Sequence, residues 1–485
     1  MLQGTGSDVG KSLLAAGLVR AYRNRGLLVR PFKPQNMSNN AAVTADGGEI
    51  GRAQALQAKA ARLPLSVHMN PVLLKPQTDI GAQVVVQGEI FGNSKAADYH
   101  ELKPQLMPKV MESFGIISDG ADLVLVEGAG SPAEVNLREG DIANMGFAEA
   151  ADVPVVLVAD IDRGGVIASI VGTHELLEES ERARLKGVIV NKFRGDASLF
   201  ESGIAIVEQR TGLPTFGVVP WFAGAAALPK EDAMALDNRD RTDAGTGDIV
   251  FAVPRFQRIA NFDDLDPLSA EPGVSVVIVE PGEAIPANAD VVLLPGSKAT
   301  LADLALLRDE GWDVDILAHR RRGGIIVGLC GGYQILGTKI SDPGGMEGEA
   351  GEAVGLGLLD VETILGGDKM LTEVDAIDAV IGADVHGYEM HIGTTKGADT
   401  TRPWMLINLS RPEGAISRDG KVMGCYLHGL FAADEFRRKF LESIRAGTFE
   451  ETAYEARVEA ALDGLADHLE QHLDLDGLLA VARGS

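Results

Sequence analysis

The sequence predicts an α/β protein made of two units, each built on a mainly parallel sheet. Short apolar runs alternate with amphipathic stretches in both halves, a glycine-rich segment opens the chain, and a Gly-x-Cys-x-Gly turn follows an apolar run in the second half. The first pattern is typical of buried parallel strands joined by helical crossovers. The other two patterns belong at strand-to-helix turns, where ligands bind in such sheets. A chain of 485 residues also exceeds the roughly 250 to 300 residues that one hydrophobic core supports.

The predicted strands fall into two groups. Those of the first half are residues 122–126, 153–159, 187–190 and 215–219, and those of the second half are residues 274–279, 291–294 and 325–329. Each run is short and rich in Val, Ile and Leu, as expected of strands that are buried on both faces.

A polar segment separates the two groups of strands. Residues 236–248, LDNRDRTDAGTGD, have no apolar periodicity and predict a linker. The expected units are therefore residues 1–235 and residues 249–445. Residues 446–485 carry Ala, Leu, Glu and Asp at helical spacing, and we expect a helical tail that packs on the second unit. Because Met1 almost directly precedes the glycine-rich segment, we expect a few residues of the first strand to be missing.

Composition limits the classes of partner. The net charge of −26 repels nucleic-acid backbones and anionic membrane surfaces, so neither is an expected partner. Cys330 and Cys425 are the only cysteines, too few for a disulfide framework, and no stretch reads as a signal peptide or a membrane helix. These features favour the reducing cytoplasm, and they leave the oligomeric state open.

The first candidate site is a cradle for a nucleoside triphosphate in the segment GTGSDVGKS. This segment opens the predicted helix LLAAGLVRAYRNRG, so the backbone from Thr5 and Gly6 through Gly10 can turn its N–H groups toward phosphates. Lys11 adds a point charge, and the Ser12 hydroxyl can reach Mg²⁺. Thr5 stands where the usual pattern has glycine, so the loop is a variant, and the alternative is a chance Gly-Lys-Ser in a plain turn.

Polar residues at other strand ends extend this site. Glu127 follows the strand DLVLV and is a candidate Mg²⁺ ligand, the alternative being a capping or solvated glutamate. Asp46, in the loop TADGGEIG, is a second candidate ligand, or else an ordinary turn aspartate. Asn191 and Lys192 follow the strand GVIV and suit recognition of the nucleotide base.

The second candidate site is a cysteine nucleophile. The strand GIIVGL runs into Cys330, and small neighbours on both sides allow the strained strand-to-helix corner that exposes such a side chain. A helix N-terminus at that corner stabilises the thiolate, which is the attacking species. The backbone N–H of Gly331 points to where an oxyanion would form, and the loop LPGSK, through Gly296, is expected to supply the second donor.

His428, at the end of the strand in KVMGCYLHGLF, is the expected general base, with His391 in GYEMHIG as its nearest rival. A single histidine is more often a structural residue than a catalyst, but a cysteine elbow in the same unit favours a Cys-His pair. Cys425 is expected to be a small buried residue on the same strand.

These motifs together resemble the glutamine-hydrolysing cobyric acid synthase family over nearly the whole chain. The carrying motifs are QGTGSDVGKS, PFKPQNMSNNA, VEGAGSPAEVNL, ADIDRGGVIASIVGT, NKFRGD, RIANFDDLDPL, LPGSKAT, GLCGGYQILG, GYEMHIG and YLHGLF. The resemblance implies a dethiobiotin-synthetase-like P-loop domain and a class I glutamine amidotransferase-like domain. It also implies ATP at residues 5–12, Mg²⁺ at Glu127 and Asp46, and Cys330 with His428 as nucleophile and base.

By the same resemblance, the substrates are glutamine, ATP and a corrinoid, adenosylcobyrinic acid a,c-diamide, amidated at positions b, d, e and g. Many class I amidotransferases carry Glu two residues after the histidine, but here that residue is Leu430, so a Cys-His dyad is expected, with Glu389 as a speculative orienting partner. Three alternatives stay open: a cobyrinic acid a,c-diamide synthase, a synthetase for another polycarboxylate such as a lipid-linked one, and a ParA-like nucleotide switch with an inactive appended domain.

Overall fold

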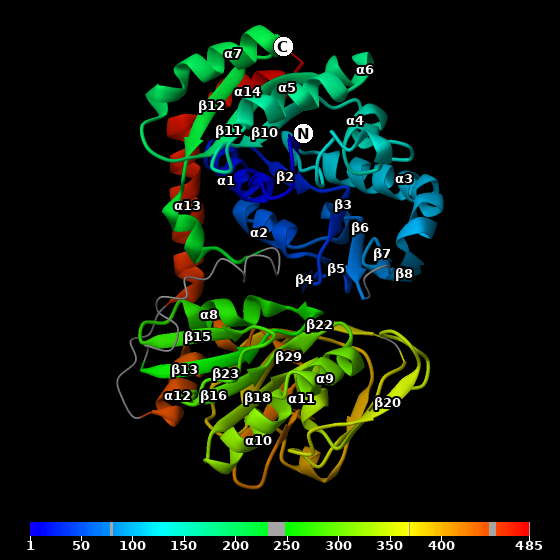
Figure 1. The fold of residues 1–485 in the computed structure, drawn as a ribbon, viewed down its shortest axis with the longest axis vertical. Helices are drawn as coiled ribbons and strands as arrows, with labels where there is room; N and C mark the ends of the chain where they lie inside the picture. Colours follow the sequence, from blue (N-terminus) through cyan, green and yellow to red (C-terminus); the bar gives the residue numbers. More distant parts are fainter. Residues whose placement is uncertain (78–80, 231–247, 368, 446–452, 485) are drawn as a thin grey trace.

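Every predicted apolar run forms a strand in the computed structural model, which describes residues 1–77, 81–230, 248–367, 369–445 and 453–484. Figure 1 shows two α/β bodies, with the first half of the chain above and the second half below. The predicted fold class is therefore confirmed. The predicted linker, except for Asp248, lies outside the described residues.

The sheet of the first half is parallel and sets the carboxyl ends of its strands at the phosphate loop. Its strands are β1 (Leu2–Gly4), β10 (Val155–Asp160), β11 (Leu185–Phe193) and β12 (Thr215–Pro220) in that order, and the parallel pair β2 (Val29–Phe32) and β9 (Leu123–Val126). A parallel bridge between Leu2 and Glu127 joins β1 to the end of β9. Parallel strands require crossovers, and helices supply them here.

The helices of the first half are α1 (Lys11–Asn24), α2 (Arg52–Ala61), α3 (Ala96–Ser118), α4 (Met145–Ala150), α5 (Val166–Leu176), α6 (Glu179–Arg182) and α7 (Glu201–Thr211). The first of these begins directly after the phosphate loop, and its N-cap, Gly10, has φ 91°. A left-handed conformation at that position favours glycine, and a Cβ there would also collide with the side chain of Asn191.

A small layer with both parallel and antiparallel strand pairs extends the first half toward the second. It consists of β3 (Gln35–Met37), β6 (Val72–Pro76), β7 (Gly81–Val86) and β8 (Glu89–Lys95), with the hairpin β4 (Ala41–Val43) and β5 (Glu49–Gly51) beside it. Ala41, Val43, Leu73 and Val85 of this layer pack with Met390 of the second half in one apolar cluster. The layer therefore places residues of the first half beside the site described below.

The second half has its own central sheet, in which the last strand alone is antiparallel. Its strands, in order, are β15 (Val274–Val279), β13 (Ile249–Pro254), β16 (Val291–Leu294), β18 (Ile325–Leu329), β28 (Val422–Cys425) and β27 (Ala415–Ile416). The helices of the second half are α8 (Asp266–Ser269), α9 (Thr300–Asp309), α10 (Trp312–Arg321), α11 (Gly331–Leu336) and α12 (Asp434–Ile444). The inner strands β13, β16, β18 and β28 are almost fully buried, which explains their continuous apolar runs, whereas the edge strand β15 is only partly buried.

Shorter sheets surround this core and carry the remaining site residues. The strands of the five-stranded sheet, in order, are β26 (Arg411–Glu413), β25 (Met405–Ile407), β22 (Met370–Asp378), β23 (Asp384–His391) and β29 (Leu427–His428). The other strands are the pair β14 (Ile259–Ala260) and β17 (Gly296–Ser297), and the sheet β20 (Gly351–Val354), β19 (Lys339–Asp342), β21 (Glu362–Ile364) and β24 (Thr394–Lys396).

The C-terminal tail packs on the first half, not on the second as the sequence led us to expect. Its helices, α13 (Tyr454–His472) and α14 (Leu475–Ala482), run beside the first half in Figure 1. Leu465 and Leu469 reach α1 at Gly17, where a Cβ would lie within 2.7 Å of both side chains. Arg20 is fully buried and pairs with Glu459 at 2.7 Å. The sequence predicted the apolar stripe of α13 but not the surface on which it packs. An apolar stripe shows that one face of a helix is buried, and it does not show which element covers that face.

Within the described ranges, no helix combines the length and apolarity that crossing a bilayer requires.

Candidate active site

Cys330 sits at the corner between β18 and α11. Its φ is 51° and its ψ is −109°, a conformation that is strained for a non-glycine residue. Gly328 and Gly332 allow the corner, because a Cβ on Gly332 would lie 2.6 Å from the carbonyl carbon of Leu294. The thiol is partly exposed and donates to the carbonyl oxygen of Met390 at 3.3 Å. This geometry matches the predicted nucleophile elbow.

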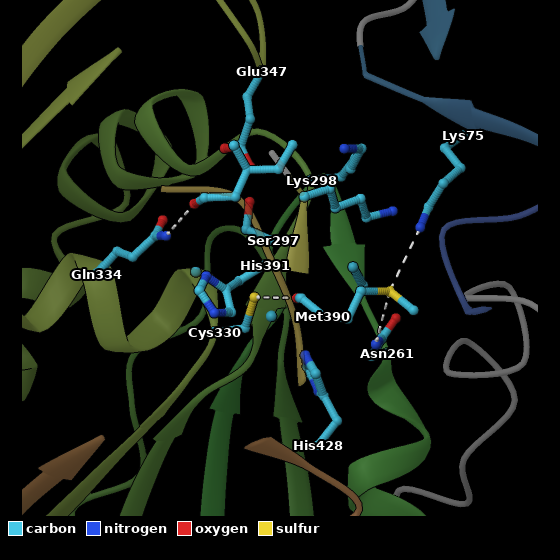
Figure 2. Close-up of a pocket in the computed structure, with 15 residues that line it drawn as sticks. Lys75, Asn261, Ser297, Lys298, Cys330, Gln334, Glu347, Met390, His391 and His428 are labelled. Carbon is cyan, nitrogen blue, oxygen red and sulfur yellow. Dashed lines mark hydrogen bonds between the residues drawn. The ribbon is translucent and has the colours of Figure 1, made fainter. Parts of the chain in front are cut away.

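His428 is buried at the end of β29 and lines the same pocket as Cys330 (Figure 2). Its Nδ1 lies 2.7 Å from a carboxylate oxygen of Asp264. The other Asp264 oxygen accepts from the backbone N–H of Gly429 at 2.6 Å, so the carboxylate is held on both sides. A carboxylate at Nδ1 fixes the ring and leaves Nε2 as the nitrogen that can exchange a proton with the sulfur.

Asp264 also sets the protonation state of His428. Burial favours the neutral ring, but the charge and hydrogen bond of Asp264, together with the nearby Cys330 sulfur, outweigh it and raise the pKa of His428 to about 10. Burial, followed by the charge of His428, lowers the pKa of His391 to about 4. The His391 ring instead stacks on Tyr426, with ring centroids 3.8 Å apart. The geometry therefore favours His428 over its rival as the base.

Asp264 is the residue that the sequence did not single out. We named Glu389 as a speculative orienting partner, but its Oε2 accepts from the Arg411 guanidinium, and its Oε1 has no hydrogen-bond partner among the described residues. The available signal was the acidic pair in RIANFDDLDPL, which lies 164 positions before His428. Nothing local in the sequence joins that segment to the histidine.

The loop after β16 supplies a backbone amide near the elbow. We expected Gly296 to be the second oxyanion donor, but Gly296 pairs with Ala260 in an antiparallel ladder, and the Lys298 N–H donates to Arg258 O at 2.9 Å. Hydrogen-bonded and non-hydrogen-bonded residue pairs alternate along an antiparallel ladder. Because Lys298 is hydrogen-bonded to Arg258, the Gly296 amide two residues away also faces β14, and the Ser297 amide between them faces away from it. Ser297 N would lie 2.9 Å from a Cβ on Gly331. The geometry thus favours Ser297 beside Gly331.

The pocket at Cys330 opens at the junction of the two halves. Its lining includes Gly296, Gly331, Cys330 and His428 from the second half, together with Lys75 from β6 of the first half. Figure 2 shows Lys75 reaching in from the first half, on the far side of the pocket from Gln334. A residue of the nucleotide-binding half therefore lies in the wall of the cysteine site.

A second connection between the halves reaches the histidine. Arg52, at the start of α2, pairs with Asp263 at 2.7 Å and donates to the Tyr388 hydroxyl at 2.8 Å. The Tyr388 ring stacks on His428 with centroids 5.3 Å apart, and Asp263 directly precedes Asp264. The arginine of the first half therefore contacts Tyr388, which stacks on the His428 ring, and Asp263, which precedes the aspartate at that ring.

The predicted phosphate cradle is formed in the first half. Lys11 Nζ donates to the carbonyl oxygens of Gly6 at 3.2 Å and Gly130 at 3.0 Å, which directs the ammonium over the loop. The Thr5 N–H donates to Val158 O at 2.9 Å and fixes the start of the loop on β10. The loop therefore has the shape and charge that a polyphosphate requires.

Asn191 and Lys192 lie against this loop. Asn191 Nδ2 donates to Val9 O at 2.8 Å, and Lys192 donates to Asp8 O and pairs with Asp160 at 2.9 Å. We expected these two residues to suit the nucleotide base, and their contacts place them beside the phosphate loop at the carboxyl end of β11.

Glu127 and Ser12 are suited to hold Mg²⁺. The Ser12 hydroxyl donates to Glu127 Oε1 at 2.7 Å, while Lys33 at 2.8 Å and Gln57 at 2.6 Å hold the same buried carboxylate. Mg²⁺ at nucleotide sites takes one or two protein oxygens and completes its shell with phosphate and water. A hydroxyl and a carboxylate at the loop meet that requirement.

Asp46, the other candidate ligand, is exposed in the turn between β4 and β5, and it makes no hydrogen bond or ion pair within the described part of the chain. No group of three or more His, Cys, Asp or Glu side chains is arranged around a metal position among the described residues. The structure therefore brings Ser12 and Glu127 together but does not place Asp46 with them.

Fold and site define a glutamine amidotransferase domain joined to a P-loop nucleotide-binding domain. Residues 250–436 match the model of the CobB/CobQ-like glutamine amidotransferase domain, and residues 1–234 match that of the CobQ/CobB/MinD/ParA nucleotide binding domain. A solved structure, PurLQS from Thermotoga maritima, is 17% identical over 45% of this chain and 98% of its own, with a TM-score of 0.30.

Two full-length relatives identify the family. A cobyric acid synthase from Cereibacter sphaeroides is 60% identical over 100% of this chain and 99% of its own length. A cobyric acid synthase from Brucella suis is 58% identical over 99% of each chain. The chain belongs to the cobyric acid synthase family, as its motifs led us to expect.

Proposed function

We propose that this enzyme uses ATP and glutamine to amidate the b, d, e and g carboxylates of adenosylcobyrinic acid a,c-diamide, giving adenosylcobyric acid in cobalamin biosynthesis. The observation that carries the proposal is Cys330 at a strained corner, in one pocket with His428 and its Asp264 partner. The names of the full-length relatives support the choice of substrate. Catalysis by a free thiolate suits the reducing cytoplasm, where we place the enzyme.

Nitrogen release takes place at Cys330. His428 takes the proton of the Cys330 thiol, the resulting thiolate attacks the side-chain amide carbon of glutamine, and the Gly331 and Ser297 amides stabilise the oxyanion. His428 gives its proton to the departing ammonia, leaving a γ-glutamyl thioester. His428 then takes a proton from water as that water attacks the thioester, which releases glutamate and restores the thiol. Asp264 holds the imidazole throughout and stabilises its charged form.

Capture of nitrogen takes place in the first half. Carboxylates transfer their acyl group to ammonia poorly, so the γ-phosphoryl group of ATP first passes to the substrate carboxylate, giving an acyl phosphate and ADP. Ammonia then displaces inorganic phosphate and forms the amide. The loop from Thr5 to Ser12 binds the phosphates, and Lys11 stabilises the charge that moves during transfer. Ser12 and Glu127 would hold Mg²⁺, which when bound neutralises phosphate charge.

We further propose that residues 1–235 are the amide synthetase and residues 249–445 the glutaminase, with a sheltered path for ammonia between them. Ammonia is mostly protonated at neutral pH and is then not nucleophilic, so shelter from water favours its capture. The position of Lys75, a first-half residue in the wall of the Cys330 pocket, supports a direct route.

The decisive experiment is incubation of the enzyme with ATP, Mg²⁺, glutamine and adenosylcobyrinic acid a,c-diamide, followed by mass spectrometry of the corrinoid. Four successive conversions of acid to amide are expected. Two amides added to cobyrinic acid, with none added to its a,c-diamide, would instead identify a cobyrinic acid a,c-diamide synthase.

The sheltered path has a separate test. When ¹⁵N-labelled ammonium is present in the medium and unlabelled glutamine is the donor, the amide product should carry little label. Label entering the amide as fast as glutamine nitrogen would exclude the path.

A further inference from the structure

A buried lysine without a partner marks the wall of the Cys330 pocket. Lys298 is 7% exposed, and no hydrogen-bond acceptor or ion-pair partner for its Nζ is found among the described residues. Figure 2 shows its side chain extending along the pocket beside Glu347 and toward Lys75. Burial, followed by the charge of Lys75, lowers the pKa of Lys298. A buried cation is unfavourable unless an anion accompanies it, so this position is suited to an anionic group of a ligand.

Two further lysines converge on the same place. Lys75 of β6 donates to Glu49 at 2.7 Å, and Lys369, which precedes β22, pairs with the other oxygen of Glu49. Burial lowers the pKa of Lys369 to about 7, and the charges of Lys75 and Lys298 add to the effect. Lys75 and Lys369 therefore share Glu49, and Lys298 adds a third lysine to the same wall, in a chain whose net charge is −26. The local excess of positive charge again indicates an anionic ligand group.

The pocket also offers a place for a cation. Glu347 lines it, and its Oε2 accepts from the backbone N–H of Thr300 at 2.9 Å. Glutamine is a zwitterion, with an α-carboxylate and an α-ammonium three carbon atoms away from the amide that Cys330 attacks. Lys298 and Glu347 thus present, beside the nucleophile, the charges opposite to those of the glutamine main chain.

We propose that Lys298, assisted by Lys75, binds the α-carboxylate of glutamine, and that Glu347 accepts its α-ammonium. The proposal rests on the proposed glutaminase function and names the groups that select its substrate. Because Lys75 belongs to the first half, the glutamine site is complete only when the two halves are docked. Glutamine binding at Cys330 therefore requires the first half, which uses the released ammonia to form the amide.

The test compares glutamine hydrolysis by the full-length wild-type enzyme and by Lys298→Met, which keeps the length of the side chain and removes its charge. The KM for glutamine should rise about 10- to 100-fold, the range for a hydrogen bond to a charged group, with a smaller change in kcat. Lys298→Arg should recover part of the loss. The matched control is Lys339→Met, on the exposed face of β19, which should leave both constants unchanged.

Two substrate analogues make the test specific. The wild-type enzyme should discriminate strongly against 4-aminobutanamide, which lacks the α-carboxylate, and Lys298→Met should lose most of that discrimination. Discrimination against glutaramate, which lacks the α-ammonium, should survive in Lys298→Met and fall in Glu347→Gln. Equal KM values for glutamine and 4-aminobutanamide with the wild-type enzyme would overturn the proposal even if the variants did not fold. Absence of any glutamine hydrolysis would instead count against the proposed function.

Discussion

The Nδ1 atom of His428 lies 2.7 Å from Oδ2 of Asp264, and the two residues are brought together from positions 164 apart in the chain. Both side chains are almost completely buried. The cysteine site therefore has a third member, although the residue two places after the histidine is Leu430. Asp264 follows β14 in the chain, whereas many class I amidotransferases carry a glutamate two residues after the histidine.

Asp264→Asn should reduce kcat for glutamine hydrolysis by about 100-fold or more, because an amide in that position stabilises neither the required tautomer nor the imidazolium. Steady-state assays of glutamate release would measure the effect. Glu389→Gln is the matched control, since its side chain pairs with Arg411 away from the histidine. Our assignment of the orienting residue fails if the control loses more activity than Asp264→Asn.

The ion pair also predicts how stability depends on pH. The pKa of His428 is raised to about 10, from an ordinary value of about 6.5, so the folded state holds the proton more tightly. The resulting stabilisation should be fully present below pH 6.5 and should disappear as the pH rises through 10. The difference in Tm between the wild-type protein and the Asp264→Asn, His428→Gln double variant should shrink over that interval. A difference that grows with pH would contradict the charged pair.

Cys330→Ser should reduce glutamine hydrolysis by about a thousandfold or more while leaving amidation with added ammonium salts, because the hydroxyl is a much weaker nucleophile than the thiolate. Cys425→Ser serves as the control. Burial raises the pKa of Cys425 well above its usual value, so this thiol stays neutral, and its loss should leave both reactions nearly intact. Glutamine hydrolysis at the wild-type rate in Cys330→Ser would remove the nucleophile from our mechanism.

Lys11→Ala should lower the amidation rate by about 100-fold or more and change glutamine hydrolysis by no more than about threefold, because the ammonium acts only on the phosphates of ATP. Parallel assays of corrinoid product and of glutamate would separate the two effects. Loss of both reactions to the same extent would mean that the two sites are not separable.

Arg52→Gln should impair glutamine hydrolysis although Arg52 belongs to the nucleotide-binding half. Removing the guanidinium leaves Asp263 buried without its partner, a change that typically costs on the order of 3 kcal/mol, and it frees the Tyr388 hydroxyl beside His428. We expect a lower Tm and a several-fold lower kcat. Arg62→Gln, an exposed change at the end of the same helix, should alter neither.

Local signatures in the sequence were enough to predict the strands, the phosphate loop and the cysteine elbow. A Gly-x-Cys-x-Gly turn after an apolar run specifies its own backbone, so Cys330 was predicted without knowledge of the rest of the fold. Ser12 was likewise predicted from the phosphate-loop motif and Glu127 from its strand-end position, and the two side chains meet at 2.7 Å.

Residues recruited from distant segments could not be predicted in this way. Asp264 and Lys75 acquire their roles only through tertiary pairing, and Asp46 resembled a ligand although its turn leaves it exposed to solvent. The second oxyanion donor beside Cys330 depends on which backbone amides of the short β14–β17 ladder are hydrogen-bonded. That pattern favours Ser297 over Gly296. Sequence spacing alone does not contain these relationships.

Because α13 packs on α1, the two bodies of the molecule do not correspond to two continuous segments of the chain. The last helices of the chain complete the body that the first helix begins, so the amidotransferase body is topologically an insertion within the nucleotide-binding body. A cut in the segment between the two bodies would therefore not yield two autonomous enzymes. The N-terminal fragment would expose the surface of α1 at Gly17 and Tyr22, which the C-terminal helices cover in the intact chain.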